Sequence, residues 1–280
     1  MAGSVDLTLA DGRNLVAHDT AEPDGGSRLV VLWHHGSPQT GRILEPVADA
    51  AARRAIRVIS FGRAAYGGSS RNPGRDVASV GIDVEHLVDA LGVERFAVMG
   101  ASGGGPHALA CAARMPGRVT GVVTFASPAP FSSTFDWFEG MQAPAALRSA
   151  LSGIEARTAH AKVDVFDPGQ FLPADWATLA GPWKVLGADA QREGEAGSDG
   201  VIDDDVAFVS PWGFDRAEVA APVLLVQGGL DRVIPPSHAQ HLLAELPDAQ
   251  LWLRPHDGHV SVLEALPVAL DWLLDRACAS

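Results

Sequence analysis

The sequence predicts an α/β fold, built on a mostly parallel eight-stranded sheet with helices on both faces. Two observations support this prediction: short apolar runs alternate with helix-patterned stretches along most of the chain, and most of these runs suit strands buried on both sides. Alternating strands and helices give parallel strand pairs with right-handed crossovers, and therefore a sheet that helices cover. A third observation, a glycine-rich turn between one strand and the next helix, indicates where a reactive group would lie.

The elements follow one another with short connections, except in one long segment. The strand-like runs cover 5–9, 14–18, 29–33, 56–60, 96–99, 119–125, 223–227 and 250–253, and the first two flank an Asp-Gly turn typical of an antiparallel hairpin. Helical patterns cover 41–54, 77–91, 107–114, 237–246 and 261–278. Between about 127 and 215 the alternation stops, and tryptophans, prolines and poorly periodic helical pieces follow. We interpret this segment as an insertion above the sheet.

Composition limits the function classes. The 280 residues, 47% hydrophobic and 20% charged, suffice for one domain with a large core and an insertion. A net charge of −13 argues against binding to nucleic acid or to an anionic membrane surface. Two cysteines, Cys111 and Cys278, give no disulfide framework. The first residues lack the pattern of a signal peptide, and no stretch approaches about 18 apolar residues, so we expect a cytoplasmic protein without a membrane span.

The segment that says most about chemistry is Gly-Ala-Ser-Gly-Gly at 100–104, which follows a strand-like run and precedes a helical stretch. A strand, a sharp turn and a helix in this order lift the serine hydroxyl above the end of a sheet, so Ser102 is a candidate nucleophile. Glycines at 100 and 104 fit a crowded turn in which a Cβ would clash. The alternative is a glycine-rich turn whose serine only caps the next helix.

A serine nucleophile needs a base, and the base needs an orienting group. In a parallel sheet both come from loops at the C-terminal ends of strands, where Asp231 and His259 follow the last two strand-like runs. The order Ser102, Asp231, His259 is that of chains in which the nucleophile turn precedes its acid and base. The alternatives are a turn or capping role for Asp231 and a helix N-terminal position for His259. His256 is a rival base, ranked lower because it lies nearer the strand.

Acyl transfer also needs donors for the negative charge that develops on the substrate oxygen. The N–H of Gly103, directly after the candidate nucleophile and at a helix N-terminus, is one candidate. The N–H of Ser37 is the other, because Gly36 lets the backbone turn inward and Pro38 favours an extended residue before it. We also expect the Ser37 hydroxyl to bind substrate. The alternative is a plain strand-to-helix loop.

We assign no metal ion. Adjacent His34 and His35 point apart in an extended chain, so they do not form a ligand pair. His238 and His241 have the spacing of one helix face, but no third ligand accompanies them.

On these motifs the chain resembles the α/β-hydrolase fold family over nearly its whole length. The motifs are His-Gly-Ser-Pro at 35–38, Gly-Ala-Ser-Gly-Gly at 100–104, Gly-Leu-Asp-Arg-Val-Ile-Pro at 229–235 and Gly-His at 258–259. The segment 61–70 resembles the family's Asp-Arg-x-Gly-x-Gly-x-Ser loop, with Gly62 where an acid is usual and Ala65 where glycine is usual. The resemblance implies a hydrolase core of residues 1–127 and 213–280, with a helical cap inserted at 128–212.

The resemblance further implies a serine hydrolase of carboxylic esters of small, largely apolar substrates. Ser102 would form an acyl-enzyme, His259 would act as base and then acid, and Asp231 would hold the histidine tautomer. Gly103 and Ser37 would supply the oxyanion donors. The cap would close an apolar pocket, and its candidate lining residues are Trp137, Phe138, Met141, Trp183 and Trp212, each with cap packing as the alternative role. No cofactor is implied, the expected partner is a small-molecule substrate, and the oligomeric state is open.

Other branches of the family compete with an esterase. Epoxide hydrolases and dehalogenases need an aspartate nucleophile, which Ser102 disfavours. C–C bond hydrolases share the His-Gly-Ser loop but usually carry tryptophan soon after the catalytic histidine, where this chain has Val260 and Ser261. Haloperoxidase-like esterases usually have methionine at the position of Gly103. Proline iminopeptidases carry His-Gly-Gly-Pro-Gly, but acids in the predicted cap keep an aminopeptidase open: Glu139, Glu155, Asp164 and 203–205. A non-hydrolytic ligand-binding or biosynthetic member of the fold is the remaining alternative.

Overall fold

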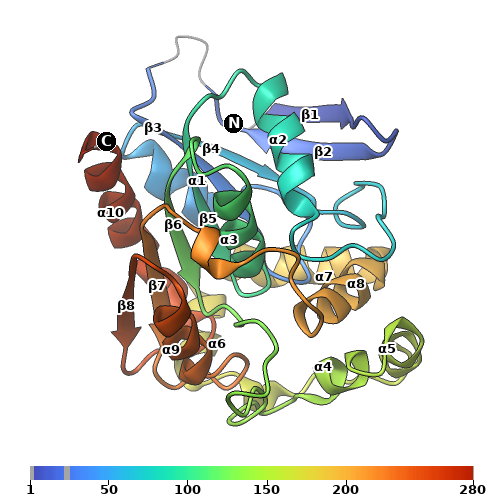
Figure 1. The fold of residues 1–280 in the computed structure, drawn as a ribbon. Helices are drawn as coiled ribbons and strands as arrows, with labels where there is room; N and C mark the ends of the chain where they lie inside the picture. The colour runs from blue at the N-terminus through green and yellow to red at the C-terminus, as the bar shows by residue number, and fades with distance from the viewer. Residues whose placement is uncertain (1–2, 22–25, 280) are drawn as a thin grey trace.

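The computed structural model describes residues 3–21 and 26–279, and one eight-stranded sheet forms its core (Figure 1). The strands are β1 (Gly3–Thr8), β2 (Asn14–Asp19), β3 (Leu29–His34), β4 (Ile56–Phe61), β5 (Phe96–Ala101), β6 (Val119–Phe125), β7 (Val223–Gly228) and β8 (Ala249–Arg254). Their order across the sheet is β1-β2-β4-β3-β5-β6-β7-β8. The β1–β2 and β2–β4 pairs are antiparallel and the others parallel, which confirms the predicted sheet with its edge hairpin. Residues 1–2, part of the segment read above for a signal peptide, lie outside the described residues.

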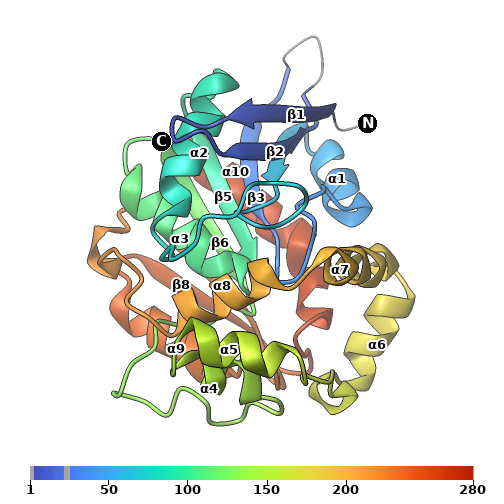
Figure 2. The same cartoon turned by 90° about the vertical axis from the view of Figure 1, so that its right-hand side faces the viewer.

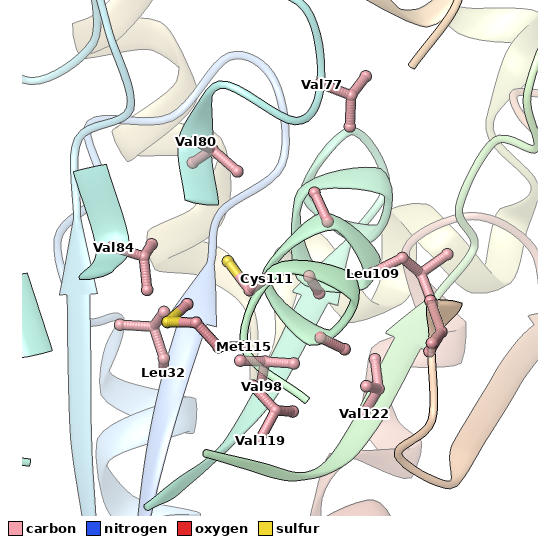
Figure 3. Packing of buried hydrophobic residues seen from close by; sticks show 14 of the residues in the cluster. Leu32, Val77, Val80, Val84, Val98, Leu109, Cys111, Met115, Val119 and Val122 are labelled. Atoms are coloured by element: carbon pink, nitrogen blue, oxygen red, sulfur yellow. The ribbon is translucent and has the colours of Figure 1, made fainter. Parts of the chain in front are cut away.

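Helices cover both faces of the sheet because successive side chains of each strand point to opposite sides. On one face, residues such as Leu32 and Val98 pack against α2 (Val80–Ala90) and α3 (Gly104–Arg114), as Figure 3 shows. The helix α9 (Pro236–Glu245) extends this layer. On the other face, Val31 and Met99 pack with α1 (Glu45–Ala52) and α10 (Leu266–Ala279). The part of the chain that the structure describes contains no helix long and apolar enough to cross a membrane.

Three expected helices are shorter than their patterns: the one predicted over 77–91 is α2, and the other two have identifiable causes. The helix predicted over 41–54 begins only at Glu45 in α1, because Gly41 has φ +81° and a Cβ there would lie 2.2 Å from the Gly62 nitrogen. That close approach fixes residue 41 in a conformation that an α-helix excludes. The helix predicted over 261–278 divides into the 3-10 helix η3 (Ser261–Ala265) and α10, and Pro267 stands in the first turn of α10, where its missing N–H costs no bond.

The segment between β6 and β7 forms five helices that lie together beyond the C-terminal ends of the parallel strands (Figures 1 and 2). They are α4 (Ala145–Ala150), α5 (Ile154–Ala161), α6 (Pro173–Ala180), α7 (Lys184–Ala196) and α8 (Asp199–Phe208). The 3-10 turn η1 (Pro168–Gln170) lies between α5 and α6, and η2 (Arg216–Glu218) follows α8. We call this layer the cap, and its bounds at 128 and 212 stay a prediction. The poor helical periodicity of the segment reflects buried polar side chains that contact the core.

Three buried carboxylates join the cap to loops of the core. Asp175 in α6 accepts hydrogen bonds from residues 260 and 261, after β8. Asp189 in α7 accepts from the N–H and hydroxyl of Thr40, after β3, at 3.0 and 2.6 Å. Asp204 in α8 accepts from the Ser37 hydroxyl in the same loop. All three residues are at most 3% exposed, so α6, α7 and α8 are held on the edge of the sheet where the candidate site lies.

Candidate active site

The turn after β5 holds Ser102 in a conformation that few residues other than glycine adopt. Its φ is +50°, and its N–H donates to the Phe125 carbonyl at 2.7 Å. The glycines around it are required by close contacts: a Cβ on Gly100 would lie 2.3 Å from the Gly104 carbonyl oxygen, and one on Gly104 would lie 2.2 Å from the His34 carbonyl oxygen. The strand, turn and helix thus pack tightly, and they present the serine at the C-terminal edge of the sheet.

The structure brings Ser102, His259 and Asp231 together from the loops after β5, β8 and β7. His259 Nε2 lies 3.0 Å from Ser102 Oγ, and His259 Nδ1 lies 2.9 Å from Asp231 Oδ2. A carboxylate only accepts, so Nδ1 carries the proton and Nε2 is free to accept from the serine hydroxyl. Asp231 is itself fixed, since its Oδ1 accepts from the N–H groups of Val233 and Ile234 at 2.8 and 3.0 Å. This is the geometry that activates a serine hydroxyl.

The surroundings of His259 make its imidazole a stronger base. Burial alone would lower the histidine pKa, because it penalises the charged form. The charge and hydrogen bond of Asp231 outweigh burial, Asp175 adds to them, and the pKa of His259 is raised. A base of raised pKa takes the serine proton more readily once it is neutral.

The loop after β3 lies directly beside the Ser102 turn. A Cβ on Gly36 would be 3.6 Å from Ser102 Cβ, and a Cβ on Gly103 would be 2.8 Å from Ser37 Oγ. Among the described residues, neither the Gly103 N–H nor the Ser37 N–H donates to a protein acceptor, and their role as oxyanion donors stays a prediction. The Ser37 hydroxyl differs: it donates to Asp204 Oδ2 at 2.5 Å. Its one proton is thus directed at a carboxylate, and the expectation that this hydroxyl binds substrate stays a prediction.

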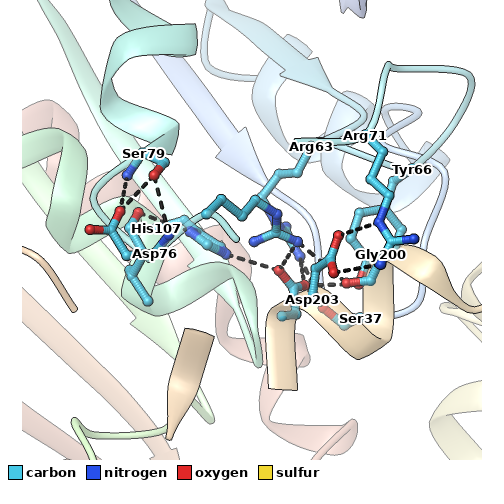
Figure 4. A network of polar contacts seen from close by, with 12 residues as sticks. Ser37, Arg63, Tyr66, Arg71, Asp76, Ser79, His107, Gly200 and Asp203 are labelled. Carbon is cyan, nitrogen blue, oxygen red and sulfur yellow. Dashed lines mark hydrogen bonds and ion pairs between the residues drawn. The ribbon is translucent and has the colours of Figure 1, made fainter. Parts of the chain in front are cut away.

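Asp204 is the centre of a buried polar network (Figure 4). Its carboxylate accepts from Ser37 Oγ, Arg63 Nη2, Tyr66 Oη and Arg75 Nη2 at 2.5–2.8 Å, and His107 Nε2 lies 3.3 Å away. Burial opposes ionisation, but the two guanidinium groups outweigh it and hold the pKa of Asp204 well below its usual range. From the sequence, Asp204 could be predicted only as one of several acids for an amine, because its partners are distant in the chain.

The other acids of that cluster are paired as well. Asp203 forms an ion pair with Arg71 at 2.8 Å, and Asp205 forms one with Arg157 at 2.6 Å. Burial nevertheless raises the pKa of Asp205 to about 6. The cluster 203–205 is therefore built into the protein through arginines.

Asp175 holds the loop that carries His259, and the sequence analysis missed it. The carboxylate accepts from the N–H groups of Val260 and Ser261 and from the Ser261 hydroxyl, at 2.8–2.9 Å, and from the Leu172 N–H at 2.9 Å. An acid three residues into a Pro-started helix is an ordinary helix N-terminal signal, so only the bond to Leu172 was accessible from the pattern. The contacts to residues 260 and 261 cross 85 and 86 positions of sequence.

The predicted lining residues lie in three different places. Trp137, Phe138 and Met141 belong to one packing cluster of the cap, and the Trp137 indole donates to the Ala129 carbonyl. Trp212 packs in the core layer with α2 and α3, and Trp183 packs on the opposite side of the sheet. Trp183 also lines an open cavity of about 550 Å³ between α1 and the start of α7. The structure does not gather the five into one wall, and their role in binding stays a prediction.

Two other phenylalanines border the site. The Phe171 ring lies nearly parallel to the His259 ring, with 6.5 Å between centroids and 12° between planes. A Cβ on Gly103 would lie 3.0 Å from the Phe208 ring, so this ring covers the turn after Ser102. Both come from the poorly periodic cap, where no spacing rule singled them out.

At the C-terminal edge of the sheet, a serine is hydrogen-bonded to a histidine, and the histidine to an aspartate. This fold together with this triad defines a hydrolytic enzyme. A family model described as alpha/beta hydrolase fold matches residues 30–266. The chain therefore belongs to the α/β-hydrolase fold family and is an enzyme of that class.

Relatives of the chain are also named as hydrolases, but of different substrates. The chain is 30% identical over 178 residues to 2-hydroxy-6-oxo-6-phenylhexa-2,4-dienoate hydrolase of Burkholderia cepacia, a match over 63% of this chain and 60% of that relative. The match therefore spans less than two thirds of that relative. The chain is also 27% identical over 253 residues to the putative carbamate hydrolase RutD of Caulobacter sp. (strain K31), a match over 86% of this chain and 88% of that relative.

A solved structure agrees with the fold. The thermophilic esterase from Thermogutta terrifontis aligns with a TM-score of 0.72 at 21% identity, over 99% of both chains.

Proposed function

We propose that the protein hydrolyses carboxylic esters of small, largely apolar substrates through an acyl-enzyme on Ser102. The observation that carries this proposal is the continuous hydrogen-bonded line from Ser102 Oγ through His259 to Asp231. His259 Nε2 takes the hydroxyl proton as Oγ attacks the carbonyl carbon, and Asp231 stabilises the imidazolium that forms. The N–H groups of Gly103 and Ser37 donate to the oxyanion of the tetrahedral intermediate.

The same groups complete the cycle. The imidazolium of His259 returns its proton to the leaving alcohol oxygen as the C–O bond breaks, which leaves the acyl group on Ser102. Water then attacks the acyl carbon while His259 takes its proton, and collapse of the second intermediate releases the acid and restores the serine hydroxyl.

The surroundings of the hydrogen-bonded Ser102–His259–Asp231 triad favour an uncharged substrate. Phe171 and Phe208 border it with apolar surface. The acids 203–205 are already paired with arginines, so they offer no ready partner for the amine of an aminopeptidase substrate. A neutral ester therefore fits the described side chains better than an aminoacyl compound does.

A C–C bond hydrolase is the second candidate, and the curated relatives favour it. Two of them, including the one from Burkholderia cepacia, are named as hydrolases of 2-hydroxy-6-oxo dienoates. Such a reaction would use the same serine, base and oxyanion donors on a different scissile bond.

Turnover of p-nitrophenyl acetate and butyrate by wild type and by Ser102→Ala tests the ester proposal. We expect the variant to lose about 10⁶-fold in kcat, because a serine and its base act as one unit. Ser152→Ala, at an exposed position, is the matched control and should retain wild-type rates. Equal rates in wild type and Ser102→Ala would refute the nucleophile assignment.

Substrates of other classes should be assayed in parallel. A vinylogous diketone acid tests the C–C reaction, and an aminoacyl-proline arylamide tests the aminopeptidase. A kcat/KM for the diketone acid far above that for butyrate esters would replace the ester proposal with the second candidate. Labelling by a phosphonate ester, followed by mass spectrometry, should place the adduct on Ser102.

A further inference from the structure

The hydroxyl of Ser37 is enclosed by cap and core together. It donates to Asp204 Oδ2 in α8, and it accepts from Arg63 Nη2, which itself donates to the same carboxylate oxygen at 2.7 Å. Arg63 also donates through Nη1 to the His35 carbonyl, so the backbone on the near side of Ser37 is held too. Figure 4 shows Ser37, Arg63 and Tyr66 converging on the helix that carries Asp203.

The residue held in this way stands at the oxyanion position. Ser37 Oγ would be 2.8 Å from a Cβ on Gly103, and the preceding Gly36 packs against the Ser102 turn. An oxyanion donor works only if its N–H is fixed about 2.7–3.1 Å from the place where the charge develops. A side chain anchored at Oγ restrains its own backbone N–H, because only the Cα and Cβ atoms separate the two.

The charges around Asp204 suit this position. A lone buried carboxylate near the oxyanion would repel the developing negative charge. Here Arg63 and Arg75 both contact it, at 2.7 and 2.6 Å, so the three groups together carry a positive charge. Burial and the nearby Arg63 lower the pKa of His107 to about 4, so the imidazole of His107 is neutral at pH 7 and leaves that balance unchanged.

We propose that Asp204 is a positioning residue of the hydrolytic reaction: from the cap, its carboxylate fixes Ser37 so that the Ser37 N–H remains preorganised for the oxyanion. This inference rests on the proposed function, since it assigns Asp204 a part in stabilising the acyl-transfer intermediates. It makes helix α8 part of the oxyanion site as well as a cover over it.

Two hydroxyl deletions separate positioning from stability. Ser37→Ala and Tyr66→Phe each remove one neutral donor to the same Asp204 oxygen, but only Ser37 belongs to the oxyanion loop. For Ser37→Ala we expect kcat on p-nitrophenyl butyrate to fall about 10- to 100-fold with KM nearly unchanged, because a displaced donor affects the transition state most. For Tyr66→Phe we expect a similar loss of thermal stability but a kcat within about twofold of wild type.

The carboxylate itself is tested by Asp204→Asn, with Asp203→Asn as the neighbouring buried control. We expect Asp204→Asn to lower kcat, and Ser37→Ala to lower it little further in that background, because the two residues act through one hydrogen bond. Asp203→Asn breaks only the pair with Arg71 and should leave kcat within about twofold. If Asp204→Asn does not fold, the two hydroxyl deletions still decide the question.

The outcomes distinguish this inference from the proposed function. Equal losses of kcat in Ser37→Ala and Tyr66→Phe would overturn the positioning role, while Ser102-dependent ester turnover by wild type would leave the ester proposal intact. Wild type without such turnover would overturn both.

Discussion

Asp175→Asn removes the charge that holds the His259 loop while it keeps the size of the side chain. In the wild type the fully buried carboxylate accepts four hydrogen bonds, one on Oδ2 from the Leu172 N–H and three on Oδ1 from Val260 and Ser261. An asparagine has one oxygen and one NH2 group. If the oxygen serves the three donors, the NH2 group faces the Leu172 N–H, and two donors oppose each other.

The cost follows from those four bonds. Three bonds change from charged to neutral and weaken by about 1 kcal/mol each, and the unpaired donor costs about 1–3 kcal/mol. The desolvation penalty of the lost charge offsets part of this sum. We expect a net destabilisation of about 2–4 kcal/mol, which lowers the melting temperature by about 3–7 °C in a chain of this size.

Differential scanning calorimetry and the pH dependence of kcat/KM form the assay. Because Asp175 contributes to the raised pKa of His259, Asp175→Asn should also move the acid limb of the profile to lower pH. Asp189→Asn is the matched control, since it alters a buried cap carboxylate that accepts from Thr40 but does not touch the histidine loop. A melting temperature within about 1 °C of wild type, with an unchanged acid limb, would refute this reasoning.

Three further outcomes are expected. For wild type, kcat/KM should fall on acidification with a midpoint above about 6.5, because His259 must be neutral to act as base and its pKa is raised; a midpoint below that value would contradict the assignment. Asp231→Asn should lower kcat by about 10⁴, because the wrong histidine tautomer is favoured, and a loss below about tenfold would point to another acid. Gly100→Ala should abolish activity or folding, since its Cβ would lie 2.3 Å from a backbone oxygen, whereas Gly117→Ala, with open space around it, is tolerated; soluble, fully active Gly100→Ala would show that the turn can relax.

Almost the whole sheet could be predicted, because a short run of apolar residues is enough to indicate a buried strand. Runs such as 29–33 and 223–226 are continuously apolar, and each became part of a strand buried between two helical layers. The ends of the helices were harder to predict from the sequence. The start of α1 depends on the contact between Gly41 and Gly62, two segments that only the folded chain brings together.

The candidate site divides in the same way. Ser102, Asp231 and His259 follow strand ends, so topology alone predicts that they lie at one edge of the sheet. Asp175 was not identified, and Asp204 only as one of several acids for an amine, because their partners lie 86 and 167 positions away. No local sequence pattern distinguishes a buried acid on a helix from a solvated one. The contacts of the cap with the candidate site could therefore not be predicted from the sequence.

The buried carboxylates of Asp175, Asp189 and Asp204, which join the cap to the core, affect how this scaffold can be re-engineered. Replacing α6 to α8 with the corresponding helices of another hydrolase would leave buried N–H and hydroxyl donors of the core without acceptors, unless the graft restored an acid at each of these three positions. The helices α4 and α5 pack on each other and on α8 and supply none of those three acids. Libraries aimed at new substrate range should therefore randomise residues 145–161 except Arg157, which pairs with Asp205 of α8, and leave the acid-bearing helices intact.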